Sequence, residues 1–161
     1  MTLTLLCVDD SSDDTLLLQR ACRRAGVRFV VQSVDDGTKA IAYLSGAEGY
    51  SDRTSYPVPK MILLDLKMPM TTGFDVLDWL RSRPEYKDLP VTVFTSSQHQ
   101  SDIRAAYRKG ANCFLSKPVE YEELLQVVRA LDKSFEQNQS PDPLRTLPVY
   151  HPEPRDSAPR D

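Results

Sequence analysis

The segment MILLDLKMPMTTGFDVL, residues 61–77, decides the fold class of this chain. It opens with an apolar run over 61–66 that contains a single charged residue, Asp65, which is typical of a short β-strand covered on both faces. Apolar side chains then recur at helical spacing over 72–81, and Pro84 follows the end of that stretch. The segment therefore predicts a buried strand followed by an amphipathic α-helix.

The same alternation of an apolar run and an amphipathic stretch occurs five times along the chain. Most of the apolar runs lack strict polar–apolar alternation, which favours parallel strands covered on both faces. Five strand–helix repeats with right-handed crossovers predict an α/β protein, a three-layer α/β/α sandwich. We expect a flavodoxin-like five-stranded parallel sheet with the order 2-1-3-4-5. The expected strands are 3–8, 29–34, 61–66, 91–95 and 113–116, and the expected helices are 13–25, 37–44, 72–81, 101–109 and 120–135.

The apolar periodicity stops near residue 135, where the composition changes. Six of the 12 prolines in the 161-residue chain lie after Ser140. A polar, proline-rich segment buries too little surface to offset its ordering entropy. We therefore predict one globular domain over 1–135 and a proline-rich tail over 136–161 that is largely disordered or becomes ordered on a partner. A tail that serves only as a spacer stays open as an alternative.

The composition excludes several classes of protein. Hydrophobic residues make up 40% and charged residues 27% of the chain, so a core can form and wholesale disorder is excluded. A net charge of −3 without a basic run argues against nucleic acid and anionic membranes as partners. No apolar stretch approaches the roughly 20 residues of a membrane span, and the opening MTLTLLCV lacks the features of a signal peptide. Three widely spaced cysteines predict buried free thiols in a reducing cytoplasm.

Carboxylate, hydroxyl and ammonium groups stand at the carboxyl ends of four predicted strands. Parallel strands present these ends at one edge of the sheet, and ligands of this architecture bind there. Residues far apart in the sequence are therefore expected to form one pocket. The five residues are Asp9, Asp10, Asp65, Thr95 and Lys117.

The residue types in this pocket predict a metal-dependent phosphoacceptor. Three carboxylates repel one another, and a divalent cation with oxygen ligands, Mg²⁺, relieves that repulsion. An ionised Asp65 beside Mg²⁺ is a competent nucleophile for a phosphoryl group. Mg²⁺, the Lys117 ammonium and the Thr95 hydroxyl then each stabilise one phosphoryl oxygen. Plainer interpretations stay open for each residue: helix capping for Asp9 and Asp10, a turn for Asp65, strand propensity for Thr95, and a solvated surface position for Lys117.

Five segments carry a resemblance to a known family. They are LLCVDDS (5–11), MILLDLKMPMTTGFDVL (61–77), VTVFTSS (91–97), KGANCFLSKPV (109–119) and the final amphipathic helix. With these segments the sequence resembles the receiver domain of two-component response regulators, the CheY-like family, over residues 1 to about 135. The resemblance implies a single-domain response regulator that accepts a phosphoryl group from a sensor histidine kinase and slowly dephosphorylates itself. It implies no enzymatic reaction beyond this self-modification.

The resemblance also implies roles for the residues around the metal. Asp65 is the implied phosphoacceptor, Asp10 binds Mg²⁺ directly, and Asp9 helps through water. The backbone carbonyl of Lys67 is an implied further protein ligand of Mg²⁺. Because the Lys67 side chain faces the mouth of the site, we expect it to affect the lifetime of the phosphate.

A second group of implied roles concerns switching. Thr95 is the implied switch hydroxyl, Lys117 pairs with the phosphoryl group, and Phe114 occupies the aromatic position that turns with Thr95. The Lys117–Pro118 peptide is implied to be cis. With no effector domain in the sequence, we expect a homodimer through the face formed by strand 4, helix 4, strand 5 and helix 5.

A narrower resemblance is to the stand-alone, phytochrome-associated response regulators. It is carried by DDGTKAIAYLSG (35–46), a polar insert over 46–59 and GANCFLSKPV (110–119). It implies a sensor kinase such as a bacterial phytochrome. The alternative is a phosphorylation-independent interaction module on the receiver fold, which would predict loss of an acid, the Thr or the Lys. An aspartyl-phosphate hydrolase is disfavoured, because its usual second Asp is Lys67 here.

Overall fold

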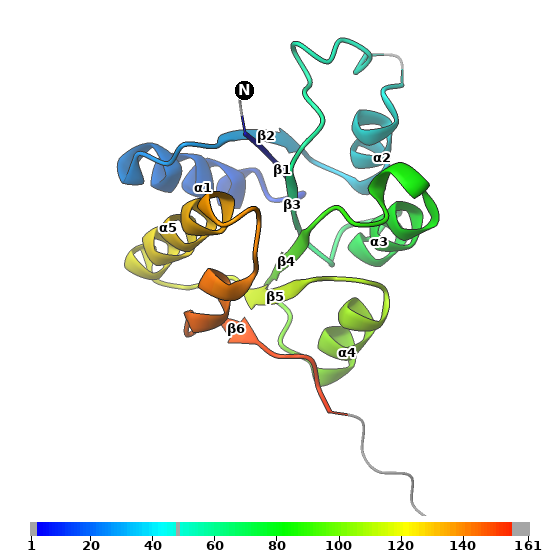
Figure 1. Ribbon diagram of the computed structural model, residues 1–161. Coiled ribbons are helices and arrows are strands. Elements are labelled where there is room, and N and C mark those ends of the chain that lie inside the picture. Colours follow the sequence, from blue (N-terminus) through cyan, green and yellow to red (C-terminus); the bar gives the residue numbers. More distant parts are fainter. Residues whose placement is uncertain (1–2, 48, 156–161) are drawn as a thin grey trace, which may run out of the picture.

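The computed structural model describes residues 3–47 and 49–155. The six strands within these residues form one sheet. The first five strands pair in parallel in the order β2-β1-β3-β4-β5, which confirms the predicted order, and β6 pairs antiparallel to β5 (Figure 1). The sixth strand was not predicted from the sequence. The strands are β1 (Thr4–Val8), β2 (Val30–Val34), β3 (Met61–Leu64), β4 (Val91–Thr95), β5 (Cys113–Ser116) and β6 (Tyr150–His151).

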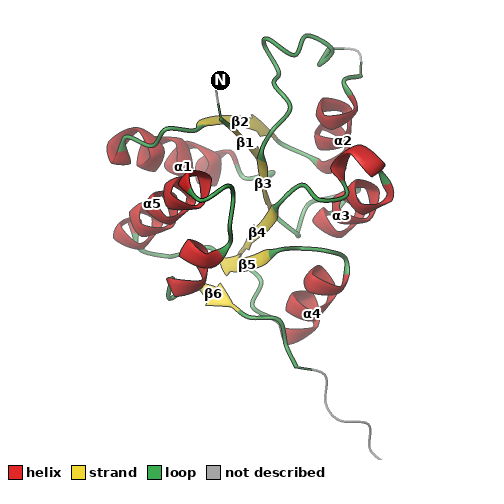
Figure 2. Ribbon diagram, viewed as in Figure 1, coloured by secondary structure: helices red, strands yellow, loops and turns green. Residues whose placement is uncertain are grey.

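Helices cover both faces of the sheet, as the predicted three-layer sandwich requires. α1 and α5 lie side by side on one face, and α2, α3 and α4 lie on the other (Figure 2). None of the helices in the described part of the chain is both long and apolar enough to cross a membrane. The α-helices are α1 (Ser12–Ala25), α2 (Gly37–Ser45), α3 (Gly73–Ser82), α4 (Gln100–Arg108) and α5 (Tyr121–Glu136), and the 3-10 helices are η1 (Pro84–Tyr86) and η2 (Asp142–Thr146).

The sheet divides the core into two apolar clusters. In β1, the side chains of Leu6 and Val8 belong to the cluster beneath α2, α3 and α4, whereas Leu5 and Cys7 belong to the cluster beneath α1 and α5. All four side chains are buried. Because successive side chains of a strand point to opposite faces, a strand covered on both sides needs a continuous apolar run. This explains why the runs in the sequence do not alternate.

Capping side chains set the starts of the two helices that follow the acidic strand ends. Ser11 Oγ accepts the backbone N–H of Asp14 at the start of α1 (3.2 Å). Thr72 and Asp75 form a capping box at the start of α3. Each cap satisfies backbone N–H groups that have no partner inside the helix. The caps therefore hold the first turns of α1 and α3 in place beside the ends of β1 and β3.

The tail differs from its predicted disorder over much of its length. η2 inserts the fully buried Leu144 into the cluster beneath α1 and α5. β6 then pairs with β5, where Phe114 lies opposite His151. This pairing satisfies backbone groups of β5 that would otherwise form an open sheet edge. A few apolar side chains and one ladder thus order a segment that its composition assigns to disorder, and the end of the predicted tail, 156–161, lies outside the described residues.

The peptide bond between Lys117 and Pro118 is trans, since the described backbone contains no cis peptide bond. The cis peptide implied by the family resemblance is therefore wrong for this structure. X–Pro bonds favour the trans form intrinsically by about 0.5–1 kcal/mol.

The polar insert between α2 and β3 is anchored to the domain. The Arg53 guanidinium donates hydrogen bonds to the carbonyl oxygens of Tyr43 (2.8 Å) and Leu44 (2.9 Å) at the end of α2. The rings of Tyr50 and Tyr56 pack against Tyr43, with centroids 5.4 and 5.8 Å from its own. The insert therefore packs against the end of α2.

Candidate functional site

Backbone hydrogen bonds join the ends of β1, β2 and β3 and bring three acidic residues together. The N–H of Asp9 donates to Val34 O in β2 (3.2 Å), and the N–H of Asp65 donates to Val8 O in β1 (2.9 Å). Asp10 follows directly after Asp9 in the chain. These bonds continue the parallel ladder, so the acids lie at the carboxyl edge of the sheet as the sequence predicted.

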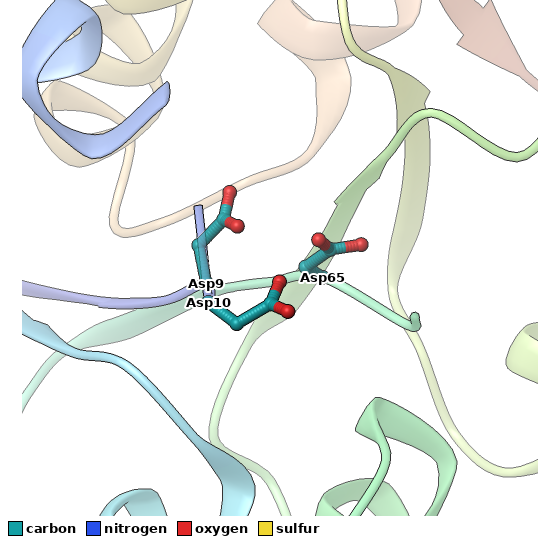
Figure 3. A group of neighbouring side chains, drawn as sticks. All are labelled: Asp9, Asp10 and Asp65. Carbon is teal, nitrogen blue, oxygen red and sulfur yellow. The ribbon is translucent and has the colours of Figure 1, made fainter. Parts of the chain in front are cut away.

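Carboxylate oxygens of Asp9, Asp10 and Asp65 all lie within 4.8 Å of one another. Figure 3 shows the carboxylate of Asp10 pointing toward Asp65. Asp9 and Asp65 are buried, whereas Asp10 is exposed. A small hard cation prefers several carboxylate oxygens, and an exposed member leaves room for entry and for water. The donor set therefore fits a divalent cation.

Lys117 supplies the positive charge of the site. Its Nζ lies 2.7 Å from Asp9 Oδ2 and 3.3 Å from Asp65 Oδ2. It also lies 2.8 Å from Asp14 Oδ2, a contact that the sequence analysis missed. Asp14 lies in the first turn of α1, and its place at the start of the helix that directly follows Asp9 and Asp10 was the signal that could have identified it.

Burial and charge act in opposite directions on the two most enclosed groups. Burial raises the pKa of Asp9 above its ordinary value, although the hydrogen bonds from Lys117 and from the Ser11 N–H (2.9 Å) oppose the shift. Burial lowers the pKa of Lys117, but hydrogen bonds to Asp14 and Asp9 outweigh it, so the net shift is upward. The lysine is therefore cationic at neutral pH and partly offsets the acidic cluster.

Thr95 lies beside this cluster at the end of β4. Its side chain is fully buried, and its Oγ1 accepts a long hydrogen bond from the Ser97 N–H (3.5 Å). The Lys117 N–H donates to Thr95 O (2.8 Å), which joins the ends of β4 and β5. The structure thus brings the three acids and the Lys117 ammonium into contact, and it links Thr95 to them through the backbone of Lys117.

Phe114 lies in β5 and is fully buried. Its ring meets the ring of His151 edge-on, with the centroids 5.7 Å apart. His151 Nε2 lies 3.2 Å from Ser116 Oγ, and the Tyr107 hydroxyl of α4 donates to His151 O (2.6 Å). The aromatic residue predicted to act in switching is therefore in direct contact with the tail.

Lys67 approaches Asp65 through its backbone and α4 through its side chain. Its N–H donates to Asp65 Oδ1 (3.3 Å), while its Nζ lies 3.1 Å from Asp102 Oδ2. A hydrogen bond from Ser97, together with Lys67, holds the pKa of Asp102 below its ordinary value. The loop after β3 is also tightly packed, because a Cβ on Gly73 would lie 2.3 Å from Asp65 O. Only glycine fits beside the carbonyl of Asp65 without a shift of the backbone.

Comparisons with known proteins agree with this geometry. A family model for the response regulator receiver domain matches residues 5–129. The probable methanogenesis regulatory protein FilR2 of Methanothrix harundinacea is 32% identical over 140 residues, which cover 86% of this chain and 88% of FilR2. The response regulator Rcp1 of Synechocystis sp. is 31% identical over 128 residues, covering 80% of this chain and 85% of Rcp1.

Solved structures give the same result. The phosphorylated cyanobacterial phytochrome response regulator RcpA superimposes with a TM-score of 0.78 at 30% identity, covering 87% of this chain and 98% of RcpA. The Mn²⁺-bound form of Rcp1 has a TM-score of 0.72 at 31% identity, covering 83% of this chain and 94% of that structure. Both the predicted fold and the predicted resemblance to phytochrome-associated regulators are confirmed.

Proposed function

The chain belongs to the response regulator receiver domain family, and on this premise we propose that Asp65 accepts a phosphoryl group from a sensor histidine kinase. The observation that carries the proposal is the position of Lys117. Its ammonium touches Asp65 and Asp9 and is held there by a third carboxylate, Asp14. An ammonium fixed beside a nucleophilic carboxylate stabilises the charge of a phosphoryl group bonded to that carboxylate.

In the proposed reaction a carboxylate oxygen of Asp65 attacks the phosphorus of a phosphohistidine. The P–N bond breaks as the O–P bond forms, and the histidine nitrogen leaves with the electron pair. Lys117 pairs with one phosphoryl oxygen, and the Thr95 hydroxyl donates to another. Water later hydrolyses the acyl phosphate to inorganic phosphate and the free carboxylate. The protein is thus a phosphoacceptor that modifies itself and not an enzyme with an external substrate.

We propose Mg²⁺ as the cation of the site. Asp10, Asp65 and the backbone carbonyl of Lys67 would hold it directly, and Asp9 would act through water. When bound, the ion offsets the negative charge of the carboxylates and of phosphoryl oxygens. The cluster of carboxylate oxygens supports a divalent ion, and so does the Mn²⁺-bound structure of the relative Rcp1.

A bacterial phytochrome is the kind of kinase we propose as phosphodonor. The support is the likeness to RcpA, a phytochrome response regulator at 30% identity. We propose that 1–135 form the receiver domain and that the ordered part of the tail packs onto it through Leu144 and β6. We also propose a cytoplasmic location, since three buried free thiols suit a reducing compartment. A phosphorylation-independent interaction module would have no need of the acids, Thr95 and Lys117 in one pocket, so their presence favours the phosphoacceptor.

The proposed output is a homodimer through the face formed by β4, α4, β5 and α5. We propose that Thr95 moves toward the phosphoryl group and that Phe114 moves with it, which changes this face. β6 already covers part of β5, so a dimer has to include or displace this segment. Sedimentation with and without beryllofluoride and Mg²⁺ tests the idea. A rise in mass with beryllofluoride supports the dimer, and an unchanged monomer mass opposes it.

Radiolabelled phosphoryl transfer from a panel of purified sensor kinases, phytochromes included, tests the acceptor and the donor together. We expect label on the wild type and on Asp13→Asn, and none on Asp65→Asn. Asp13 is a matched control because it is an exposed acid in the first turn of α1, next to Asp14. Label on Asp65→Asn would refute the assignment of the acceptor, and a protein that no kinase labels would contradict the proposed function.

A further inference from the structure

One carboxylate connects the two loops that flank the phosphoacceptor. Asp102, in the first turn of α4, accepts a hydrogen bond from Ser97 Oγ at 2.5 Å. The same oxygen, Oδ2, lies 3.1 Å from Lys67 Nζ. Lys67 is two residues beyond Asp65, and Ser97 is two residues beyond Thr95. A single oxygen of α4 therefore joins the loop after β3 to the loop after β4.

The contact of Lys67 Nζ with Asp102 keeps the Lys67 ammonium away from the carboxylate of Asp65. Its backbone N–H already faces Asp65 Oδ1 at 3.3 Å, but its side chain runs to α4. The Lys67 side chain is 59% exposed and the Asp102 side chain only 16% exposed. The lysine is therefore the mobile partner, on a long flexible stem, and the aspartate is the fixed one.

A phosphoryl group on Asp65 would change the charge that Lys67 meets. It adds about −1.5 to −2 charge and three strong acceptor oxygens next to the Lys67 backbone. The carboxylate of Asp102 offers a single negative charge and is shared with Ser97. The phosphoryl group and Asp102 thus compete for one ammonium.

We propose that Asp102 is a positioning residue that holds Lys67 off the unmodified Asp65 and loses it to the phosphoryl group. The inference rests on the proposed function. Transfer of the ammonium removes the side-chain link between the loop after β3 and α4. The same helix carries Tyr107, whose hydroxyl holds His151 of the tail. When the Lys67 ammonium moves from Asp102 to the phosphoryl group, α4 and the tail therefore respond to phosphorylation by a second route, besides Thr95 and Phe114.

Calorimetric titration of beryllofluoride with Mg²⁺ into the full chain tests the competition. The proteins are wild type, Asp102→Asn, Lys67→Ala and the double variant. Removal of an ion pair of this exposure changes the competition by a factor of about two to five. We expect Asp102→Asn to bind beryllofluoride tighter by that factor and Lys67→Ala to bind it more weakly. The double variant should match Lys67→Ala, because Asp102 acts only through the lysine.

Asp78→Asn is the matched control. Asp78 in α3 pairs with Lys109 at 2.8 Å, an exposed lysine–aspartate contact that does not reach the phosphoacceptor, so its loss should leave the affinity unchanged. Equal affinities of wild type and Asp102→Asn would overturn the inference alone. So would an effect of Asp102→Asn that persists without Lys67, since that would mark a merely structural role. A wild type that binds beryllofluoride no better than Asp65→Asn would overturn both the inference and the proposed function.

Discussion

Replacement of Lys117 by alanine removes the ammonium that contacts Asp9 at 2.7 Å and Asp65 at 3.3 Å. The side chains of the two acids are 6% and 7% exposed, so water replaces the lost partner poorly. Removing one partner of a buried ion pair costs about 3–5 kcal/mol, whereas a surface pair contributes about 0–1 kcal/mol. Lys117 is 11% exposed, so its pairs with the two acids are buried ion pairs. We expect the free energy of unfolding at pH 7 to fall by about 3 kcal/mol.

The loss should become smaller as the pH falls. Burial raises the pKa of Asp9, and the hydrogen bond from Lys117 opposes this shift. Removal of Lys117 should therefore raise the pKa of Asp9 further. A carboxyl group whose pKa is higher in the folded state binds its proton preferentially there. Its contribution to stability is present at low pH and is lost as the pH rises through the folded pKa. Lys117→Ala should therefore lie closer to the wild type at about pH 4.5 than at pH 7.

Urea unfolding followed by circular dichroism measures both effects. Lys109→Ala is the matched control, because its Asp78 pair is a surface contact between side chains 36% and 56% exposed. A saturating divalent cation adds about 2.7 kcal/mol at 100 times its dissociation constant, and Mg²⁺ should stabilise Lys117→Ala more than the wild type because it replaces the missing charge. A loss no larger than that of Lys109→Ala, or one that grows on acidification, would refute this account of the lysine.

Three further predictions concern packing beside Asp65, in the tail and in the core. Gly73→Ala places a Cβ 2.3 Å from Asp65 O, so it should cost about 1–3 kcal/mol and slow phosphoryl transfer; unchanged unfolding and transfer would contradict the tight loop. Leu144→Ala should cost about 2–5 kcal/mol and speed hydrogen exchange in β6, because the fully buried Leu144 fixes the tail to the core, whereas Leu17→Ala, at a position 42% exposed, should cost far less. Equal costs would mean that the tail is not packed. Burial raises the pKa of all three thiols to about 12, so a thiol reagent at pH 8 should label the folded protein slowly and the urea-unfolded protein fully; rapid labelling when folded would contradict the burial of Cys7, Cys22 and Cys113.

The pocket could be predicted from the sequence because parallel topology fixes where strand ends meet. Asp65 and Lys117 are 52 residues apart, yet each follows an apolar run whose carboxyl end lies at the same edge. Asp14 was missed because its role depends on which way the first turn of α1 faces, and the cap at Ser11 determines this. Its place in the first turn of the helix that directly follows Asp9 and Asp10 was the one local signal for it.

The tail and Asp102 show what sequence patterns omit. Leu144 lies in a proline-rich stretch whose average composition indicates disorder, and its burial depends on a gap beside α5 and an open edge at β5 that only the folded domain provides. The link from Asp102 to Lys67 depends on the conformation of two loops, which no periodicity encodes. In both cases the outcome depends on tertiary contacts, which the local sequence pattern does not encode.

The most direct test of the central claim is to locate the phosphoryl group chemically. The protein is phosphorylated by a kinase that labels it, the acyl phosphate is reduced with sodium borohydride, and the modified residue is mapped by peptide mass spectrometry. We predict homoserine at position 65 and unmodified aspartates at 9 and 10. Homoserine at Asp9 or Asp10, or a labelled protein whose phosphoryl group resists reduction, would contradict the assignment of Asp65 as the acceptor.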